Sequence, residues 1–493
     1  MAQHLRLFII IVFILTKLCS SSPLVELGLV TPTATPDPFA HYRVALQPKF
    51  RDDIESLPPL PRYHITVQLD ERQSRLNGVT RITIPSPDSE IVLRLYPNLS
   101  HYNGSMNISR ANINQIPVTV NPLDADSTAV RLMIPPQADG SLSDMAVVDL
   151  TFSLDLGHVP DSKGSYTLFG WDGATLSLPG FYPTLAVRQA GEWVIEQPPS
   201  HGDVLFNEVA LYQLDITLPQ ELIVVASGVT VNLINNSNQT RTWQITGGPL
   251  RDMTVVAGPF QALSETGAGA TITSYYLPGN ESGARDALAH ATAALRLYSD
   301  RYGPYPYTEL DIVDAPLNMY GMEYTGLVMI GEDLYRNQRE FLRFLVAHEV
   351  AHQWWYAIVG NNPYQHPWLD EGLTEYSAFD YYRGVYGQPR AEALLTGHWY
   401  IPFDQAMQGG IDGRVDRPAR EFDSTSYQLL VYAKSALFFN ALRIELGDET
   451  YQQIIQTYYA ENRYQIVTPK HFLAIAERVS GQDLNHLAEK WLR

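Results

Sequence analysis

The stretch His348-Glu349-Val350-Ala351-His352 decides how this sequence is interpreted, because it places two histidines four residues apart in a predicted helix. A helix turns once every 3.6 residues, so His348 and His352 project from one face and can bind the same ion. Glu349 lies beside them but points partly away, where its carboxylate can accept a proton from water. The alternative is a helix with two satisfied histidines. The motif favours a zinc site, with Glu349 as general base.

A second acidic motif supplies the rest of a ligand set. The stretch 368–376 reads Trp-Leu-Asp-Glu-Gly-Leu-Thr-Glu-Tyr, and eighteen residues separate His352 from Glu371. Catalytic zinc sites use three protein ligands and keep a fourth position open for water, so Glu371 is predicted as the third ligand. Glu375 lies one helical turn further on, where it can hold a ligating imidazole by its second nitrogen. The alternative for Glu375 is a solvated helix face.

The composition indicates a large globular protein. With 493 residues, and roughly 150 residues per domain, two to four domains are expected. Hydrophobic residues make up 45% of the chain and charged residues 18%, which excludes a disordered or coiled-coil chain. Lys and Arg number 34 against 53 Asp and Glu, for a net charge of −19. Since nucleic-acid binders carry a basic surface, no nucleic-acid partner is expected.

The hydrophobic pattern divides the chain into two folded parts. Apolar residues alternate with period two between about Tyr63 and Gln261, in runs separated by Gly, Pro, Asn and Asp. Beyond about residue 271 the period becomes helical. The sequence predicts an α+β fold, with an antiparallel β-domain at 56–262 and a mostly helical domain at 263–493. The expected helices of the second domain cover 284–298, 339–359, 370–385 and 427–446, with a short strand at 310–313.

Residues 1–22 have the pattern of an export signal, with an apolar run from Leu7 to Leu15 followed by Lys17. Nine apolar residues fall short of the roughly 20 that cross a bilayer, so no stable membrane span is expected in the mature chain. Retention of the leader would anchor the N-terminus, and Cys19, the only cysteine, is an alternative lipidation site. The Pro- and Thr-rich residues 23–55 should form an extended spacer. We expect an exported protein that is extracellular, periplasmic or on the cell surface.

Two further motifs complete a family resemblance. Residues 320–327 read Tyr-Gly-Met-Glu-Tyr-Thr-Gly-Leu, which is similar to G-x-M-E-N-x-G-L, and residues 432–437 read Tyr-Ala-Lys-Ser-Ala-Leu, which is similar to Y-x-K-G-A-L. Together with HExxH, eighteen residues and Glu, these motifs resemble those of the aminopeptidase N-like gluzincins. The resemblance runs from about Tyr63 to Arg493. It implies a thermolysin-like catalytic domain at 263–493 with one zinc ion, bound by His348, His352 and Glu371.

The resemblance also implies roles around the zinc. Glu323, with Gly321 and Met322 beside it, corresponds to the element that binds the free α-amine of a peptide substrate. Tyr432 corresponds to the tyrosine that donates to the tetrahedral oxyanion, and Tyr427 to a tyrosine near the site in some members. These assignments imply a zinc-dependent aminopeptidase that acts on peptides. The alternatives are an endopeptidase or an epoxide hydrolase on the same scaffold, and a non-catalytic binding module.

The chain departs from the family pattern at several points. Family members usually carry Gly and Asn where this chain has Tyr320 and Tyr324, which predicts a narrower pocket beside Glu323. A second amine-binding Gln or Glu is expected from the β-domain, and 171–185 is the stretch in which to seek it. Because the sequence ends where the family's catalytic domain ends, the C-terminal helical domain is not expected, and the site should be more open.

Overall fold

The structure is a computed structural model that describes residues 37–137, 141, 143–157, 169–317 and 320–493. Phe39–Arg493 form one compact unit. The predicted export signal, including Cys19, lies outside the described residues, as does the Pro- and Thr-rich tract up to residue 36.

The predicted spacer at 23–55 extends too far toward the C-terminus. Residues from Phe39 onward are packed, with Leu46, Phe50 and Ile54 buried in the core. The apolar side chains of this segment contact the folded unit, and the backbone nitrogen of Gln47 donates to the carbonyl oxygen of Pro306. Burial of these side chains therefore outweighs the local Pro-rich composition. The segment forms the short helices η1 (Arg43–Ala45), η2 (Pro48–Phe50) and α1 (Asp53–Ser56).

The first part of the chain is built mainly of β-sheets, and the largest has eight strands. In β1, alternate side chains from Tyr63 to Leu69 are buried and those between them are exposed, as the period of two predicts. Most pairs are antiparallel, but β1 and β14 run parallel. The sheet contains, in spatial order, β16 (Val229–Asn235), β17 (Thr240–Leu250), β14 (Ala210–Pro219), β1 (Arg62–Asp70), β2 (Arg75–Pro85), β8 (Met145–Asp155), β4 (Ser105–Ile113) and β5 (Ile116–Pro117).

Two four-stranded sheets and a hairpin complete this part. A short helix, η3 (Tyr96–Asn98), follows strand β3 (Glu90–Arg94) in the described part of the chain. One sheet has the order β15 (Ile223–Ala226), β18 (Val255–Gly258), β10 (Leu176–Leu178) and β9 (Gly170–Trp171). The other has the order β11 (Thr184–Leu185), β3 (Glu90–Arg94), β7 (Ala129–Met133) and β6 (Asn121–Pro122), and the hairpin pairs β12 (Arg188–Gln189) with β13 (Glu192–Trp193).

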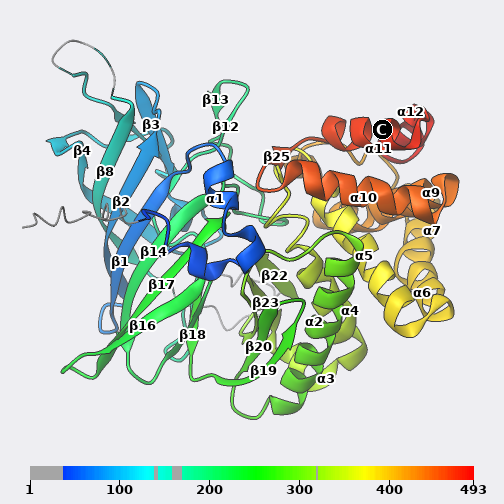
Figure 1. Cartoon of the computed structure of the whole chain (residues 1–493), viewed down its shortest axis with the longest axis horizontal. Coiled ribbons are helices and arrows are strands. Elements are labelled where there is room, and N and C mark those ends of the chain that lie inside the picture. Colours follow the sequence, from blue (N-terminus) through cyan, green and yellow to red (C-terminus); the bar gives the residue numbers. More distant parts are fainter. Residues whose placement is uncertain (1–36, 138–140, 142, 158–168, 318–319) are drawn as a thin grey trace, which may run out of the picture. The chain divides into compact units, whose positions relative to one another are not determined.

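A five-stranded sheet begins the second part of the chain. Its order is β19 (Gln261–Gly267), β20 (Ala270–Tyr276), β21 (Glu309–Ala315), β23 (Leu327–Gly331) and β22 (Gly321–Tyr324). The pairs β20/β21 and β21/β23 are parallel, whereas β22 runs antiparallel to β23 at the edge. Helices α2 (Glu281–Arg301) and α4 (Arg339–Ala351) contact this sheet (Figure 1).

The remaining elements are mostly helical, so the predicted α+β fold class is confirmed. Two expected helices differ in detail. The segment predicted as a helix at 339–359 leaves the helix after Ala351, and the segment at 427–446 begins with a π-helical stretch, η6 (Tyr427–Lys434). In the described residues, strand β24 (Gly360–Asn361) pairs with β25 (Ile466–Val467). The other helices of the described residues are α3 (Glu332–Asn337), α5 (Trp368–Tyr386), α6 (Gln388–Leu394), the π-helical η4 (Leu395–Tyr400), α7 (Ile401–Gln408), η5 (Ala419–Glu421), α8 (Ser424–Ser426), α9 (Ser435–Leu446), α10 (Asp448–Asn462), α11 (Pro469–Ser480) and α12 (Asn485–Trp491).

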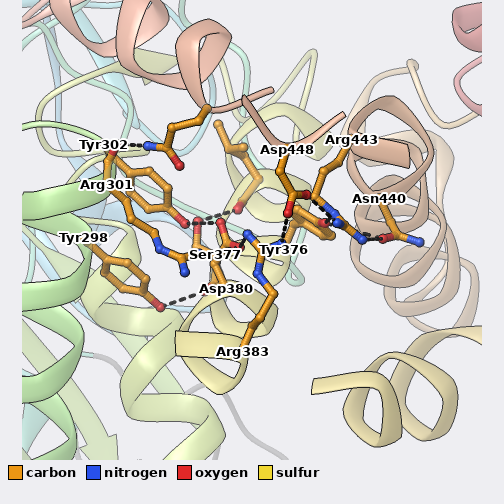
Figure 2. Close-up of polar contacts among 12 residues, drawn as sticks. Tyr298, Arg301, Tyr302, Tyr376, Ser377, Asp380, Arg383, Asn440, Arg443 and Asp448 are labelled. Carbon is orange, nitrogen blue, oxygen red and sulfur yellow. Dashed lines mark hydrogen bonds and ion pairs between the residues drawn. The ribbon is translucent and has the colours of Figure 1, made fainter. Parts of the chain in front are cut away.

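Helix α5 is held by a network of charged and phenolic side chains that Figure 2 shows. Asp380 accepts hydrogen bonds from Arg301 at 2.8 Å and from Tyr302 at 3.1 Å, and Arg383 lies 3.0 Å from the same carboxylate. Asp380 is almost fully buried, so these contacts compensate the desolvation of its charge. The network connects α5 to α2.

A buried arginine joins the β-sheet part to the helical part. The guanidinium of Arg251, between β17 and β18, donates to the carbonyl oxygens of Tyr356 at 2.7 Å and Asn207 at 3.0 Å. The next residue, Asp252, accepts from the hydroxyl of Tyr356 at 2.9 Å and from the backbone nitrogen of Thr325 at 3.0 Å. Thr325 directly follows β22, so this pair of charged residues anchors the edge strand.

Replacing Arg251 by Ala should lower the free energy of unfolding by about 2–4 kcal/mol, because buried carbonyl oxygens lose their donors and a cavity remains. Chemical denaturation followed by circular dichroism measures the change. The matched control is Arg81→Ala, since Arg81 pairs with Asp149 on the solvated face of the large sheet and should change stability by less than about 1 kcal/mol. Equal stability of the two variants would contradict the role of Arg251.

Candidate metal centre

The structure brings His348, His352 and Glu371 together as a compact triangle of ligand atoms. The two Nε2 atoms lie 3.2 Å apart, and Oε2 of Glu371 lies 3.4 Å from each of them. A tetrahedral zinc ion with ligand distances of about 2.0–2.1 Å requires ligand atoms about 3.3 Å apart. Helices α4 and α5 therefore hold the three atoms at the spacing of a zinc site.

A hydrogen bond to the protein backbone turns Nε2 of His352 toward the centre, whereas Nδ1 of His348 is buried without a hydrogen bond among the described residues. Nδ1 of His352 lies 3.0 Å from the carbonyl oxygen of Trp355, and since a carbonyl can only accept, Nδ1 carries the proton. The neutral ring then presents the lone pair of Nε2 to a metal. Glu375 Oε1 lies 3.7 Å from Nδ1 of His348, and its other oxygen accepts from the indole nitrogen of Trp399 at 2.8 Å. Glu375 is buried beside the ligand, not on a solvated helix face.

The charges of the centre favour a bound cation. Oε2 of Glu371 is buried without a hydrogen-bond donor, and so is Oε2 of Glu349. Burial alone would lower the pKa of His352, but Glu323 and Glu371 raise it well above its usual value. Burial would raise the pKa of Glu371, yet the two imidazoles lower it to about 2. The site therefore demands positive charge, and the donor set of two imidazoles and a carboxylate fits one catalytic zinc ion.

Glu349 lies beside the metal ligands and against the edge strand β22. A Cβ atom on Gly321 would come within 2.3 Å of Oε1 of Glu349, so only glycine permits this approach. Burial raises the pKa of Glu349 to about 8 and nearby carboxylates add to the effect, whereas His352 opposes it. A divalent cation beside it favours the ionised form. The carboxylate is thus placed to exchange a proton with a molecule bound at the metal.

Tyr432 reaches the centre from η6. Its hydroxyl donates to Oε1 of Glu371 at 2.5 Å, and burial raises the pKa of the phenol well above its usual value, so it keeps its proton. The close packing of α5 against α9 makes this contact possible, because a Cβ on Gly372 would lie 2.5 Å from the side chain of Ser435. The ring of Tyr427 lies 5.8 Å from that of Tyr432, and its hydroxyl has no hydrogen-bond partner among the described residues.

A cavity of about 860 Å³ opens on the centre. Gly321, His348, Glu349, Glu375, Tyr427 and Tyr432 line it, so it contains five of the side chains that the sequence singled out and one backbone position. Met322 faces a separate cavity of about 10 Å³ beside Glu323. A cleft of this volume can hold several residues of a peptide or a small organic substrate.

The β-domain supplies a carboxylate that the sequence analysis missed. Asp203 and Glu323 are both buried and line the same small cavity. Burial raises the pKa of Asp203 to about 7, with Glu371 adding to the effect and a hydrogen bond with Glu323 opposing it. Burial and the charge of Asp203 raise the pKa of Glu323 well above its usual range. Among the ion pairs of the described residues, neither carboxylate pairs with Lys or Arg. An acidic pair of this kind suits an organic cation.

The stretch 171–185, where an amine-binding Gln or Glu was expected, supplies no lining residue to the large or the small cavity within the described part of the chain. The contribution comes instead from the loop that contains His201, Gly202 and Asp203. The hydrophobic pattern of this loop has no regular period, and its acidic residue is Asp203 instead of the expected Gln or Glu. The sequence signal was therefore a single acidic residue shortly after the Pro-Pro-Ser stretch 198–200. Asp203 comes close to Glu323 of β22 only in the folded chain.

A family comparison agrees with this geometry. The peptidase family M1 domain matches residues 286–491, which include all three ligands, Glu349 and Tyr432. This match supports the resemblance of the chain to the aminopeptidase N-like gluzincins.

Proteins similar to this chain are found in plants and animals. Aminopeptidase M1-B from Oryza sativa subsp. japonica is 25% identical over 308 residues, which cover 58% of this chain and 34% of the relative. Endoplasmic reticulum aminopeptidase 1 from Mus musculus is 27% identical over 226 residues, covering 42% of this chain and 24% of the relative. The matched part thus spans about a quarter to a third of the length of these two relatives.

The fold of this chain is also similar to that of a solved structure. An M1 zinc metallopeptidase from Deinococcus radiodurans superposes with a TM-score of 0.65 at 18% identity, and the match covers 88% of this chain and 95% of the other. This likeness extends over both the β-sheet part and the helical part. It supports the assignment of the two-part architecture to one fold.

The two tyrosines that depart from the family pattern have different surroundings. Tyr324 is buried, its carbonyl oxygen accepts from Gln353 at 3.0 Å, and it lines the small cavity beside Glu323. Tyr324 therefore lies beside Glu323, while the narrower pocket remains a prediction. Tyr320 is 54% exposed and lines the large cavity instead.

Loss of the two imidazoles should abolish zinc binding. The double variant His348→Ala, His352→Ala removes two of three ligand atoms, so purified protein should contain less than about a tenth of an equivalent of zinc by elemental analysis. Glu349→Gln keeps every ligand and should retain one equivalent. His486→Ala, at an exposed histidine of α12, is the matched control. Stoichiometric zinc in the double variant would contradict the ligand assignment.

Proposed function

We propose that this chain is a zinc-dependent aminopeptidase that releases N-terminal residues from peptides. The observation that carries the proposal is the pair of buried carboxylates, Glu323 and Asp203, next to the zinc ligands and without a Lys or Arg partner among the ion pairs of the described residues. A peptide's free α-amine is a cation of the right size for this pair. In a site shielded from water, such an attraction is stronger than on the surface.

The residues of the chain have the chemistry that peptide hydrolysis requires. Zinc, when bound by His348, His352 and Glu371, acts as a Lewis acid and makes water a nucleophile at neutral pH. Glu349 accepts the proton of the attacking water and returns it to the nitrogen of the leaving amine. Tyr432 donates its hydroxyl proton in a hydrogen bond to the oxyanion that forms on the scissile carbonyl.

The edge strand supports an extended binding mode. In the described sheet β22 is the last strand, so its outer backbone groups can pair with a peptide. Gly321 lies against Glu349, and Glu323 lies two residues further along the same strand. Since a strand rises about 3.3 Å per residue, the amine site and the general base are separated by about the length of one to two peptide residues. This separation places the cleaved bond within the first residues of a peptide whose amine is bound at Glu323.

The alternatives have less support. An endopeptidase does not need two unpaired carboxylates beyond the metal, and an epoxide hydrolase does not need an amine site. A non-catalytic module does not need the general base and the phenol that are both present here. The sequences of the M1 relatives also favour aminopeptidase activity, because those relatives are named aminopeptidases.

Glu349→Gln should lower kcat by about 10²–10⁴-fold while one equivalent of zinc is retained, because the variant loses the proton acceptor but no ligand. Tyr432→Phe should lower kcat by about 10²–10³-fold through loss of one oxyanion donor. Hydrolysis of aminoacyl amides measures both. The exposed Tyr400, changed to Phe, is the matched control. Near wild-type turnover in either variant would show that the assigned roles are wrong.

A free N-terminus should be required. A free 10-residue peptide (about 33 Å when extended) should be cleaved at least about 100-fold faster than its acetylated form, because acetylation leaves buried carboxylates unpaired. Glu323→Gln and Asp203→Asn should each shrink this ratio, whereas Glu265→Gln, on the exposed strand β19, should not.

Mass spectrometry of the same digests separates aminopeptidase from endopeptidase. Products shortened stepwise from the N-terminus support the proposal. Internal fragments from the acetylated peptide would refute it and favour the endopeptidase.

We further propose that the protein is exported. The support is the apolar run Leu7–Leu15 with its flanking basic residues, and in the described part of the chain the helices are too short or too polar to cross a bilayer. Expression of the full sequence with a C-terminal tag, followed by N-terminal sequencing of the secreted protein, should show cleavage near Ser20–Ser22. An intact N-terminus on a membrane-bound protein would favour a retained leader that acts as an anchor.

A further inference from the structure

The geometry of the centre defines the direction in which a peptide crosses it. The amine site lies at Glu323, and Glu349 lies against Gly321, two residues earlier in β22. A peptide whose amine is at Glu323 and whose first carbonyl is near Glu349 therefore runs from Glu323 past Gly321 toward Tyr320. The residues that follow the cleaved bond must lie beyond Gly321.

Four aromatic side chains gather on this side of the cavity, and we call them the aromatic wall. Tyr320 packs edge-on against Phe341 with ring centres 4.8 Å apart, and Phe341 lies 6.1 Å from Phe344. Phe344 in turn lies 4.3 Å from the ring of His398, which comes from η4. All four side chains line the large cavity.

The wall follows the helix that carries the zinc ligands. Phe344 is four residues before His348 and Phe341 is seven residues before it, so they lie on the same face of α4, about 6 Å and 10 Å along the axis. An extended peptide advances about 3.3 Å per residue. The wall therefore spans the positions of the first two or three residues after the cleaved bond.

The volume and the charge around the wall both suit apolar side chains. Phe341, Phe344 and His398 also line a neighbouring cavity of about 350 Å³, so the wall separates two hollows that can each accept a side chain. The described lining of the large cavity contains Glu349 and Glu375 but no Lys or Arg. An acidic side chain entering there would meet like charges without a counterion, whereas an aromatic or aliphatic one would bury its surface on the rings.

We propose that the aromatic wall selects a large apolar or aromatic residue immediately after the cleaved bond, and that the following residue reaches the neighbouring cavity. The inference rests on the proposed aminopeptidase function and adds a preference for the second residue of the substrate.

The test uses peptides of the form Ala-Xaa-Ala-Ala-amide, with Phe, Leu, Ala or Asp as the second residue. The measured quantity is kcat/KM for release of the first alanine. Phe and Leu should exceed Ala by at least about tenfold, and Asp should be the poorest substrate. Alanine amide ends before the wall, so its hydrolysis reports separately on the zinc centre.

Two variants locate the selection on the wall. Tyr320→Ala changes an exposed side chain and Phe341→Ala a half-buried one, so the chain should fold in both cases. Each should reduce the ratio of Phe to Ala at the second position to less than about threefold. Ile401→Ala removes a side chain that is 48% exposed near η4 and outside both cavities, and should leave the ratio as in the unchanged protein.

The outcomes distinguish this inference from the function on which it rests. Hydrolysis of alanine amide together with equal rates for all four peptides would overturn the selection but not the aminopeptidase. A preference that persists in both wall variants would also overturn it, because another surface would then select the residue. Failure to hydrolyse alanine amide and every peptide would overturn the proposed function, and this inference with it.

Discussion

The mutual approach of His348, His352 and Glu371 is the constraint on which the rest of the structure depends. Two imidazole lone pairs and a carboxylate oxygen lie within 3.4 Å of one another in a buried site. Such an arrangement is unfavourable without a cation, so the scaffold must impose it. The hydroxyl of Tyr298 does so directly, because it donates to backbone carbonyl oxygens of both α4 and α5, the helices that carry the ligands. Close packing at Gly372 then brings Tyr432 onto Glu371.

More carboxylates surround the three ligand atoms than a metal ion alone would need. This excess of negative charge suits two cations, a metal ion and an ammonium group. Glu371 is held ionised by the imidazoles, whereas burial and mutual repulsion disfavour the charged forms of Glu323, Asp203 and Glu349. A metal ion relieves the repulsion at the ligands, and an ammonium group relieves it at Glu323 and Asp203. In the proposed function, affinity for a substrate amine and affinity for the metal would arise from the same excess of negative charge.

The β-sheet part is a component of the site as well as a support for it. It supplies Asp203 from a loop, and the charged pair Arg251 and Asp252 connects it to Tyr356 and to the end of β22. Because β22 positions both Glu323 and Gly321, a shift of the two parts relative to one another would separate the amine site from Glu349. The buried contacts of Arg251 oppose such a shift.

The sequence by itself determined the elements whose chemistry depends on local spacing. A separation of four residues on a helix places His348 and His352 on one face, and alternation with period two specifies the strands of the large sheet. Tertiary structure alone decided that Asp203 joins Glu323, that four aromatic rings from three segments form a wall, and that residues 39–56 pack into the core despite a Pro-rich start. The physical reason is that local periodicity reports which face of an element is buried, whereas contacts between distant segments depend on how complementary surfaces pack, which no short stretch of sequence encodes.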